Sequence, residues 1–171
     1  MKIAILVEDV YQVLEVWYPY LRMQEEGYDV VLVGTGKKEY KSKEGYPVSV
    51  DYSIKEASVK EFSAVIIPGG YAPDILRRYP AVNTFVKDMF DAGKVVAAIC
   101  HGGWVLVSAG VLHGRKATSF YAIKDDMVNA GAEFIDAEVV VDNNLITSRT
   151  PFDLPSFCKA IIQALHESCV H

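Results

Sequence analysis

The sequence lacks the charge pattern of a protein that binds nucleic acid or a membrane surface. Its 17 Lys and Arg residues are outnumbered by 22 Asp and Glu residues, which gives a formal net charge of −5 at pH 7. Nucleic acid and anionic lipid both favour a basic surface, so we expect neither as a partner. The lysine-rich stretch 37–43 is interrupted by Glu39, and we interpret it as a solvated hairpin or sheet edge.

Long apolar segments are also absent, apart from residues 95–112, which carry no formally charged side chain. That length approaches what a membrane span requires. Polar and turn-forming residues interrupt this run, so a buried strand followed by a buried helix fits it better: Cys100, His101, Gly102, Gly103 and Ser108. The opening segment MKIAILVEDV turns acidic too soon for a signal peptide. We therefore expect a soluble protein.

Cysteine is scarce, with three residues in the chain. An odd number of cysteines without an export signal argues against a disulfide framework and favours a reducing compartment, so we expect a cytoplasmic protein. Cys158 falls on an apolar helical face and is expected in the core. Cys169 lies in what we expect to be a frayed tail. Only Cys100 directly follows a predicted buried strand, which is the position expected for a reactive thiol.

The chain has no internal repeat, low-complexity tract or linker, so its 171 residues are expected to form one domain, 1–171. We predict helices over 15–26, 82–92, 122–130 and 151–167, with Pro19 tolerated only if it falls in a first helical turn. Short apolar or alternating segments predict strands at 2–7, 28–33, 64–67, 94–99, 138–141 and 145–148, and a hairpin over 39–50. Continuous apolar strands alternating with helices indicate a doubly wound α/β sandwich with a mainly parallel sheet.

In such a sheet, ligands bind outside the carboxyl ends of the strands. Three segments follow predicted strands in this way: 8–15, Gly69–Gly70 and Cys100–His101. The glycine pair could bring a backbone N–H close to a substrate, or it could simply end a strand. The three segments together predict where a site would form.

The segment around Cys100 reads VVAAICHGG and fits a nucleophile elbow, because Ala98 and Gly102 are small residues two positions before and after the thiol. The following helix would offer N–H groups that favour a thiolate and could hold an oxyanion. The alternative is a buried structural cysteine. His101 could take the proton or be a simple turn residue. Glu15, among apolar neighbours, is either a solvated carboxylate or a protonated donor to the sulfur.

The segments AICHG, IIPGG, YAPD and IKDDMVNAGAEFIDAEVVVD resemble the ThiJ/PfpI family of the class I glutamine amidotransferase-like superfamily, most of all its PfpI-like intracellular cysteine peptidases. The resemblance implies a flavodoxin-like fold, Cys100 as nucleophile, His101 as base and Glu15 bonded to the sulfur. It also implies an oxyanion hole made by the N–H groups of Gly70 and His101. Asp74 would orient the histidine of a neighbouring subunit, so the partner would be a second copy, in a homodimer or a hexamer-like ring of dimers. The alternative for Asp74 is a simple N-cap of a helical segment at 75–78.

The chain departs from the family pattern at four places. Gly103 replaces a proline, Asp74 is shorter than the usual glutamate, and the acidic stretch before Glu15 becomes Gln12-Val13-Leu14. The segment SFYAIKDD places Phe120 and Tyr121 near the expected pocket. These departures bear on substrate specificity and on the third member of the triad, and they leave the fold unaffected.

The leading functional hypothesis is a cysteine hydrolase acting on peptides or small acyl compounds. The alternative is a glyoxalase or protein deglycase that uses the same residues on glyoxal-type aldehydes or their adducts. A second alternative is a redox-responsive chaperone or sensor based on Cys100 oxidation. A glutamine amidotransferase is less consistent, because His166 and Glu167 are adjacent rather than two residues apart. No cofactor and no metal is implied, since His113, His166 and His171 lack metal-ligand spacing.

Overall fold

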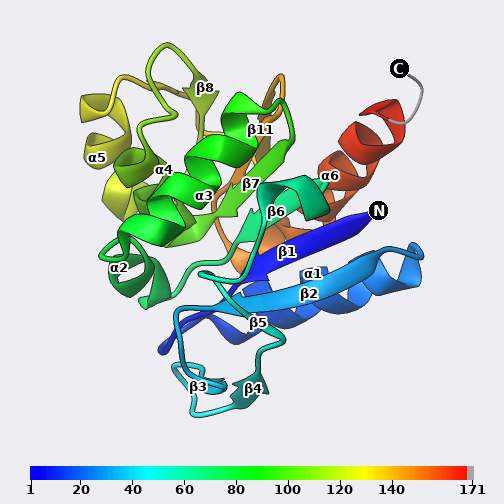
Figure 1. The fold of residues 1–171 in the computed structure, drawn as a ribbon. Coiled ribbons are helices and arrows are strands. Elements are labelled where there is room, and N and C mark those ends of the chain that lie inside the picture. The colour runs from blue at the N-terminus through cyan, green and yellow to red at the C-terminus, as the bar shows by residue number, and fades with distance from the viewer. Residues whose placement is uncertain (169–171) are drawn as a thin grey trace.

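The computed structural model describes residues 1–168 and has the predicted three-layer α/β sandwich (Figure 1). The central sheet has seven strands in the order β10-β11-β7-β6-β1-β2-β5. All pair in parallel except β10, which is antiparallel to β11. Its strands are β1 (Lys2–Leu6), β2 (Asp29–Gly34), β5 (Tyr52–Ser53), β6 (Ala64–Ile67), β7 (Val95–Ile99), β10 (Val139–Asp142) and β11 (Leu145–Ser148).

The principal strands follow the flavodoxin order, with β2 and β1 on one side of β6 and with β7 and β11 on the other. The helices are α1 (Val13–Glu25), α2 (Ala72–Leu76), α3 (Pro80–Asp91), α4 (Gly103–Ala109), α5 (Lys124–Asn129) and α6 (Leu154–Ser168). Single 3-10 turns cover Val59–Glu61, Cys100–Gly102, Tyr121–Ile123 and Pro151–Asp153. No helix among residues 1–168 is long and apolar enough to cross a membrane.

The side chains of β1 point alternately to the two faces of the sheet and so contribute to two separate parts of the core. Ile3 and Ile5 belong to a buried cluster with residues of α1 and α6, whereas Ala4 and Leu6 belong to a second cluster with residues of α3 and α4. Successive side chains of a strand point to opposite faces, so one apolar run supplies both cores. Cys158, which is 1% exposed, packs in the first cluster as predicted. Cys169 lies outside the described residues.

Two small sheets lie beside the main one: β3 (Glu39–Lys41) with β4 (Pro47–Ser49), and β8 (Lys116–Ala117) with β9 (Glu133–Phe134). The first is the predicted hairpin, antiparallel with Tyr40 opposite Val48. Its turn, residues 42–46, is joined to the loop that follows β1 by an isolated bridge between Tyr11 and Ser42. This contact between distant segments becomes important at the site.

The prediction for Pro19 was wrong. It lies inside α1 rather than in its first turn, and it is buried. Proline cannot donate the backbone hydrogen bond that would reach the carbonyl of Glu15, four residues earlier. Burial of the apolar face of α1, which includes Val16 and Met23, outweighs that loss. Helix α2 (Ala72–Leu76) begins three residues before the helical segment at 75–78 that was considered after Asp74.

Candidate active site

Cys100 lies at a sharp turn between β7 and α4. Ile99 is extended, Cys100 has a left-handed backbone with φ of 58°, and a 3-10 turn then leads into the helix. Left-handed geometry is unfavourable for a residue with a side chain and is frequent at functional sites. Gly102 makes the turn sterically feasible, because a Cβ there would lie under 3.0 Å from the carbonyl oxygen of Ile67. The structure therefore has the geometry of a nucleophile elbow.

Gly69 and Gly70 form a narrow wall beside the thiol. A Cβ on Gly69 would lie 2.8 Å from the Cβ of Cys100 and 3.0 Å from the backbone nitrogen of His101. Gly70 has φ of +82°, and a Cβ there would lie 2.5 Å from the backbone nitrogen of Gln12. Side chains at either position would close the gap, so both glycines are needed for the loops after β1, β6 and β7 to meet.

Glu15 lies in the first turn of α1 with no exposed surface. Its Oε2 accepts a 2.6 Å hydrogen bond from the backbone N–H of Gly69. Its Oε1 is buried and has no hydrogen-bond partner within residues 1–168. Burial raises the pKa of this carboxyl to about 7, against the opposing effects of the Gly69 N–H, the Cys100 thiol and the Lys43 charge.

Burial and the negative charge of Glu15 raise the pKa of the Cys100 thiol to about 12, although the backbone N–H groups of His101 and Gly70 act to lower it. The predicted stabilisation of a thiolate by N–H groups is therefore present but outweighed by desolvation. Glu15 and Cys100 titrate as a coupled pair, which loses its first proton near the carboxyl value. After that first proton is lost, the pair is either protonated Glu15 beside a thiolate or ionised Glu15 beside a thiol, and both forms carry the same total charge.

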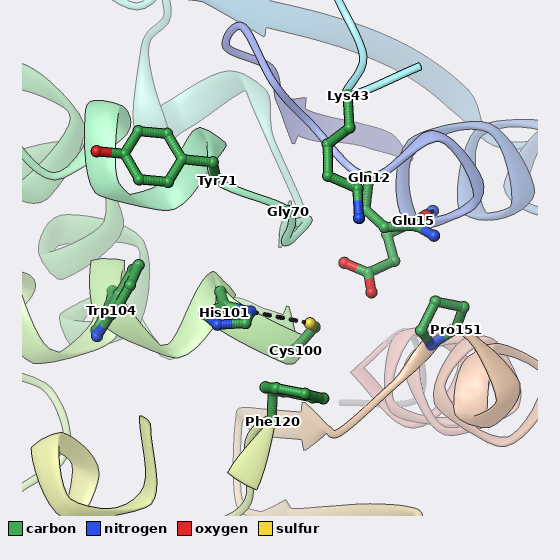
Figure 2. A pocket seen from close by; sticks show the side chains of 10 residues that line it. All are labelled: Gln12, Glu15, Lys43, Gly70, Tyr71, Cys100, His101, Trp104, Phe120 and Pro151. Carbon is green, nitrogen blue, oxygen red and sulfur yellow. Dashed lines mark hydrogen bonds between the residues drawn. The ribbon is translucent and has the colours of Figure 1, made fainter. Parts of the chain in front are cut away.

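His101 is positioned to exchange a proton with the thiol, because its Nδ1 lies 3.2 Å from Sγ of Cys100 (Figure 2). The imidazole is stacked on Phe120 at 4.9 Å and meets the edge of Trp104 at 5.1 Å between ring centroids. Burial and the nearby charge of Lys43 lower the pKa of His101, so the neutral, proton-accepting form is favoured. No carboxylate in the described part of the chain bonds to this ring.

Asp74 is not brought to the pocket of its own chain. It lies on α2 and pairs with Arg78, one turn further along that helix. The interpretation of Asp74 as an N-cap was wrong, because α2 begins at Ala72 and its N-cap is Tyr71. Asp74 instead occupies the first helical turn, where a negative charge is favourable. Its predicted role toward the histidine of a second copy stays a prediction.

Cys100 opens into a cavity of about 390 Å³. Its lining residues come from six separate parts of the chain and lie around Cys100 and His101 in Figure 2: Gln12, Glu15, Lys43, Gly70, Tyr71, Cys100, His101, Trp104, Phe120 and Pro151. Phe120 lies in this cavity as expected. Tyr121 does not; it is 75% exposed and lines a neighbouring hollow. Within residues 1–168, no group of His, Cys, Asp and Glu side chains could hold a metal ion.

Sequence reasoning missed Lys43, Tyr71, Trp104 and Pro151 as lining residues. Lys43 was interpreted as solvated because Glu39 interrupts the lysine-rich stretch 37–43. It comes to the cavity through pairing between the hairpin and the loop after β1, where its backbone N–H bonds to the carbonyl of Tyr11 at 3.0 Å. Trp104 lies one helical turn after His101 in chain order, which is the one signal that could have suggested it.

Comparison with known proteins gives a consistent result. The family model described as DJ-1/PfpI family matches residues 1–164. The chain is 44% identical over 165 residues to "Deglycase PfpI" of Pyrococcus furiosus, covering 96% of this chain and 99% of that protein. It is 40% identical to "Putative cysteine protease YraA" of Bacillus subtilis, with coverage of 96% and 98%.

Among solved structures, a two-domain protein from Anabaena variabilis with DJ-1/ThiJ/PfpI-like and ferritin-like domains has a TM-score of 0.94 at 44% identity. The match covers 96% of this chain and 48% of that one.

Proposed function

Because this chain belongs to the DJ-1/PfpI family, we propose that it is a deglycase that acts on adducts of small glyoxal-type aldehydes with amines or thiols. It is an enzyme of the deglycase or cysteine hydrolase kind, as the names of its relatives describe. The observation that supports the proposal most is a thiol 3.2 Å from an imidazole nitrogen, facing a cavity of about 390 Å³. That volume suits a small carbonyl unit better than a folded peptide segment.

In the proposed reaction, the Cys100 sulfur attacks the carbinol carbon that joins the aldehyde unit to the amine. A carbon–sulfur bond forms and the carbon–nitrogen bond breaks. The amine leaves with a proton delivered from His101, which had taken it from the thiol. The product on the enzyme is a thiohemiacetal. For a dicarbonyl adduct, the proton on the thiohemiacetal carbon moves to the neighbouring carbonyl carbon and the hydroxyl proton moves to that carbonyl's oxygen, which gives a thioester. Water then hydrolyses the thioester and releases a 2-hydroxy acid and the free thiol.

Two backbone N–H groups are suited to hold the oxygen that gains negative charge in these steps. They belong to Gly70 and His101, which both interact with the sulfur of Cys100 in the free site. Donors fixed by the backbone need no reorganisation when charge develops, which is the advantage of a preformed oxyanion hole. Glu15 is proposed to keep a proton near the sulfur, and this role is consistent with its burial and its raised pKa.

The test is release of unmodified amine from an adduct of methylglyoxal with N-acetyl-lysine, followed by mass spectrometry. A reagent that traps free methylglyoxal should be present in every sample, including a blank without enzyme, because spontaneous reversal of the adduct also releases amine. Wild type should release amine faster than the trapped blank, Cys100→Ser should match the blank, and Cys158→Ser should retain wild-type rates. Equal rates for wild type and Cys100→Ser would refute the proposal.

A peptidase is the second candidate, favoured by the relative named as a putative cysteine protease and by the paired thiol and imidazole. The same attack on a peptide carbonyl would give an acyl-enzyme. Unfolded casein and short fluorogenic peptides test it. Cleavage that disappears in Cys100→Ser, together with no release of amine from adducts, would favour the peptidase over the deglycase.

We also propose that the working form is a homo-oligomer in which Asp74 reaches His101 of another copy. The imidazole uses Nδ1 toward the thiol, so Nε2 is the atom left for such a carboxylate. Asp74 would have to exchange its present partner, Arg78, for the ring or bridge both. A cytoplasmic location is proposed as well, because the site needs Cys100 as a free thiol and reducing conditions preserve it.

A further inference from the structure

Lys43 is held over the active-site cavity by two contacts of the hairpin. Its backbone N–H donates to the carbonyl of Tyr11 at 3.0 Å, and Ser42, the residue before it, forms a bridge with the same tyrosine. The Oγ of Ser42 accepts from the backbone N–H groups of Glu44 and Tyr46 at 3.1 and 3.0 Å. The tip of the hairpin is therefore ordered, and Figure 2 shows the Lys43 side chain extending into the pocket toward Glu15.

The ammonium group of Lys43 has no ion pair or hydrogen bond within the described chain, whereas Lys37 on the same hairpin pairs with Asp9 at 2.6 Å. Its charge nevertheless acts on the site, because it lowers the pKa of both Glu15 and His101. Since burial also favours neutral His101, Lys43 supplies the positive charge of this cavity near neutral pH. A chain with a net charge of −5 here presents an unpaired cation to its active site.

Gln12 adds a neutral donor to the same wall. Its Oε1 caps α1 by accepting from the backbone N–H groups of Leu14 and Glu15 at 2.7 and 3.1 Å. That use of the oxygen leaves the Nε2 amide protons without a partner in the part of the chain that the structure describes. Because Gln12 is an amide, it adds no negative charge to the cavity that Lys43 also lines.

We propose that Lys43 and the amide of Gln12 form an anion subsite beside Cys100, which selects substrates that carry a carboxylate next to the reacting carbon. The simplest members of this class are adducts of an amine with a 2-oxo acid aldehyde such as glyoxylate. In that case the sulfur displaces the amine, a proton passes to the departing nitrogen, and the thiohemiacetal then breaks its carbon–sulfur bond to release glyoxylate and the thiol. This step needs no oxidant, reductant or water.

The choice of this substrate class rests on the proposed function, but the subsite can be measured without turnover. Iodoacetate and iodoacetamide are alkylating reagents of nearly equal size that differ in charge, and iodoacetate carries its carboxylate next to the reacting carbon. The ratio of their rates at Cys100, quantified by mass spectrometry of the peptide, reports recognition of the anion. Any change in thiolate population affects both rates and cancels in the ratio.

Lys43→Met should lower the iodoacetate-to-iodoacetamide ratio by about threefold or more, a modest effect because an exposed lysine is screened by solvent. Lys43→Arg should largely preserve the ratio, and Gln12→Glu should lower it by placing a carboxylate beside Lys43. In wild type the ratio should fall as salt rises from about 0.05 to 0.5 M. Glycolate should slow alkylation of wild type more than ethylene glycol does, and Lys43→Met should lose that difference.

Lys38→Met is the matched control, because Lys38 is exposed directly before β3 of this hairpin and does not line the cavity. It removes the same charge and should leave the ratio unchanged. An equal fall in both lysine variants would assign the effect to the overall field of the protein and overturn the subsite. An unchanged ratio in Lys43→Met would overturn it too. An intact ratio effect with no deglycase activity would instead refute the proposed function and keep the subsite.

Discussion

Replacing Glu15 by Gln should stabilise the folded protein at alkaline pH and leave its stability nearly unchanged at acidic pH. Burial raises the pKa of the Glu15 carboxyl from 4.5 to about 7. Each pKa unit corresponds to about 1.4 kcal/mol, so ionised Glu15 costs the folded state about 3 kcal/mol. A raised pKa means that the folded protein binds the proton more tightly. The stability that protonated Glu15 contributes to the folded state is therefore fully present below about pH 4.5 and is lost as pH rises through 7.

Glutamine suits this position because its amide oxygen can accept from the N–H of Gly69, as Oε2 of Glu15 does. Its amide nitrogen would replace the buried, unpartnered Oε1 and could donate to the Cys100 sulfur. The variant thus removes the ionisation and keeps the shape, which isolates the electrostatic effect from packing.

The measurement is urea unfolding of wild type and Glu15→Gln at about pH 4.5 and pH 8.5, at one fixed protein concentration so that assembly does not bias the comparison. The stability gained by the variant should increase by about 3 kcal/mol between the two pH values. Glu25→Gln is the control, since Glu25 is an exposed carboxylate of the same helix. Equal gains at both pH values, or the same pH dependence in Glu25→Gln, would refute the reasoning.

The remaining predictions concern the nucleophile, the oligomer and the turn. Iodoacetamide should alkylate Cys100 before Cys158, because Cys100 borders a cavity and receives N–H groups whereas Cys158 is buried in the core; equal rates from peptide mapping would contradict this. Asp74→Asn should lower turnover about tenfold or more if Asp74 orients a histidine across subunits, and specific activity should fall on dilution; full activity in a verified monomer would disprove it. Gly102→Ala should cost about 1–3 kcal/mol in urea unfolding through its clash with Ile67, and an unchanged midpoint would show that the turn relaxes.

The sheet was predictable because its strands are short apolar runs that end at turn residues. The segments predicted at 64–67 and 145–148 match β6 and β11 residue for residue. Cys100 could be found because an elbow has a local signature, with Ala98 and Gly102 around the thiol. These features depend on neighbours in the sequence, so the sequence alone contains them.

The walls of the cavity were less predictable because they depend on contacts between distant segments. Lys43 reaches the site through hairpin pairing with Tyr11, and Tyr121 turns to solvent while Phe120 turns inward. The pKa of Cys100 was expected to be lowered by N–H groups, but burial and the charge of Glu15 act in the opposite direction. The local sequence pattern is enough to predict the N–H donors near the thiol. The pKa of the thiol also depends on burial and on the charge of Glu15, which only the whole fold determines.

The bond between Glu15 and Gly69 joins residues 54 positions apart in the chain, and this separation has a consequence for folding kinetics. Contacts between distant segments close large loops and form late, after local helices and hairpins. The groups that shield Cys100 belong to three separate loops, so they come together only when the parallel sheet is complete. Until then a newly made chain carries an exposed cysteine, open to oxidation and to reaction with aldehydes.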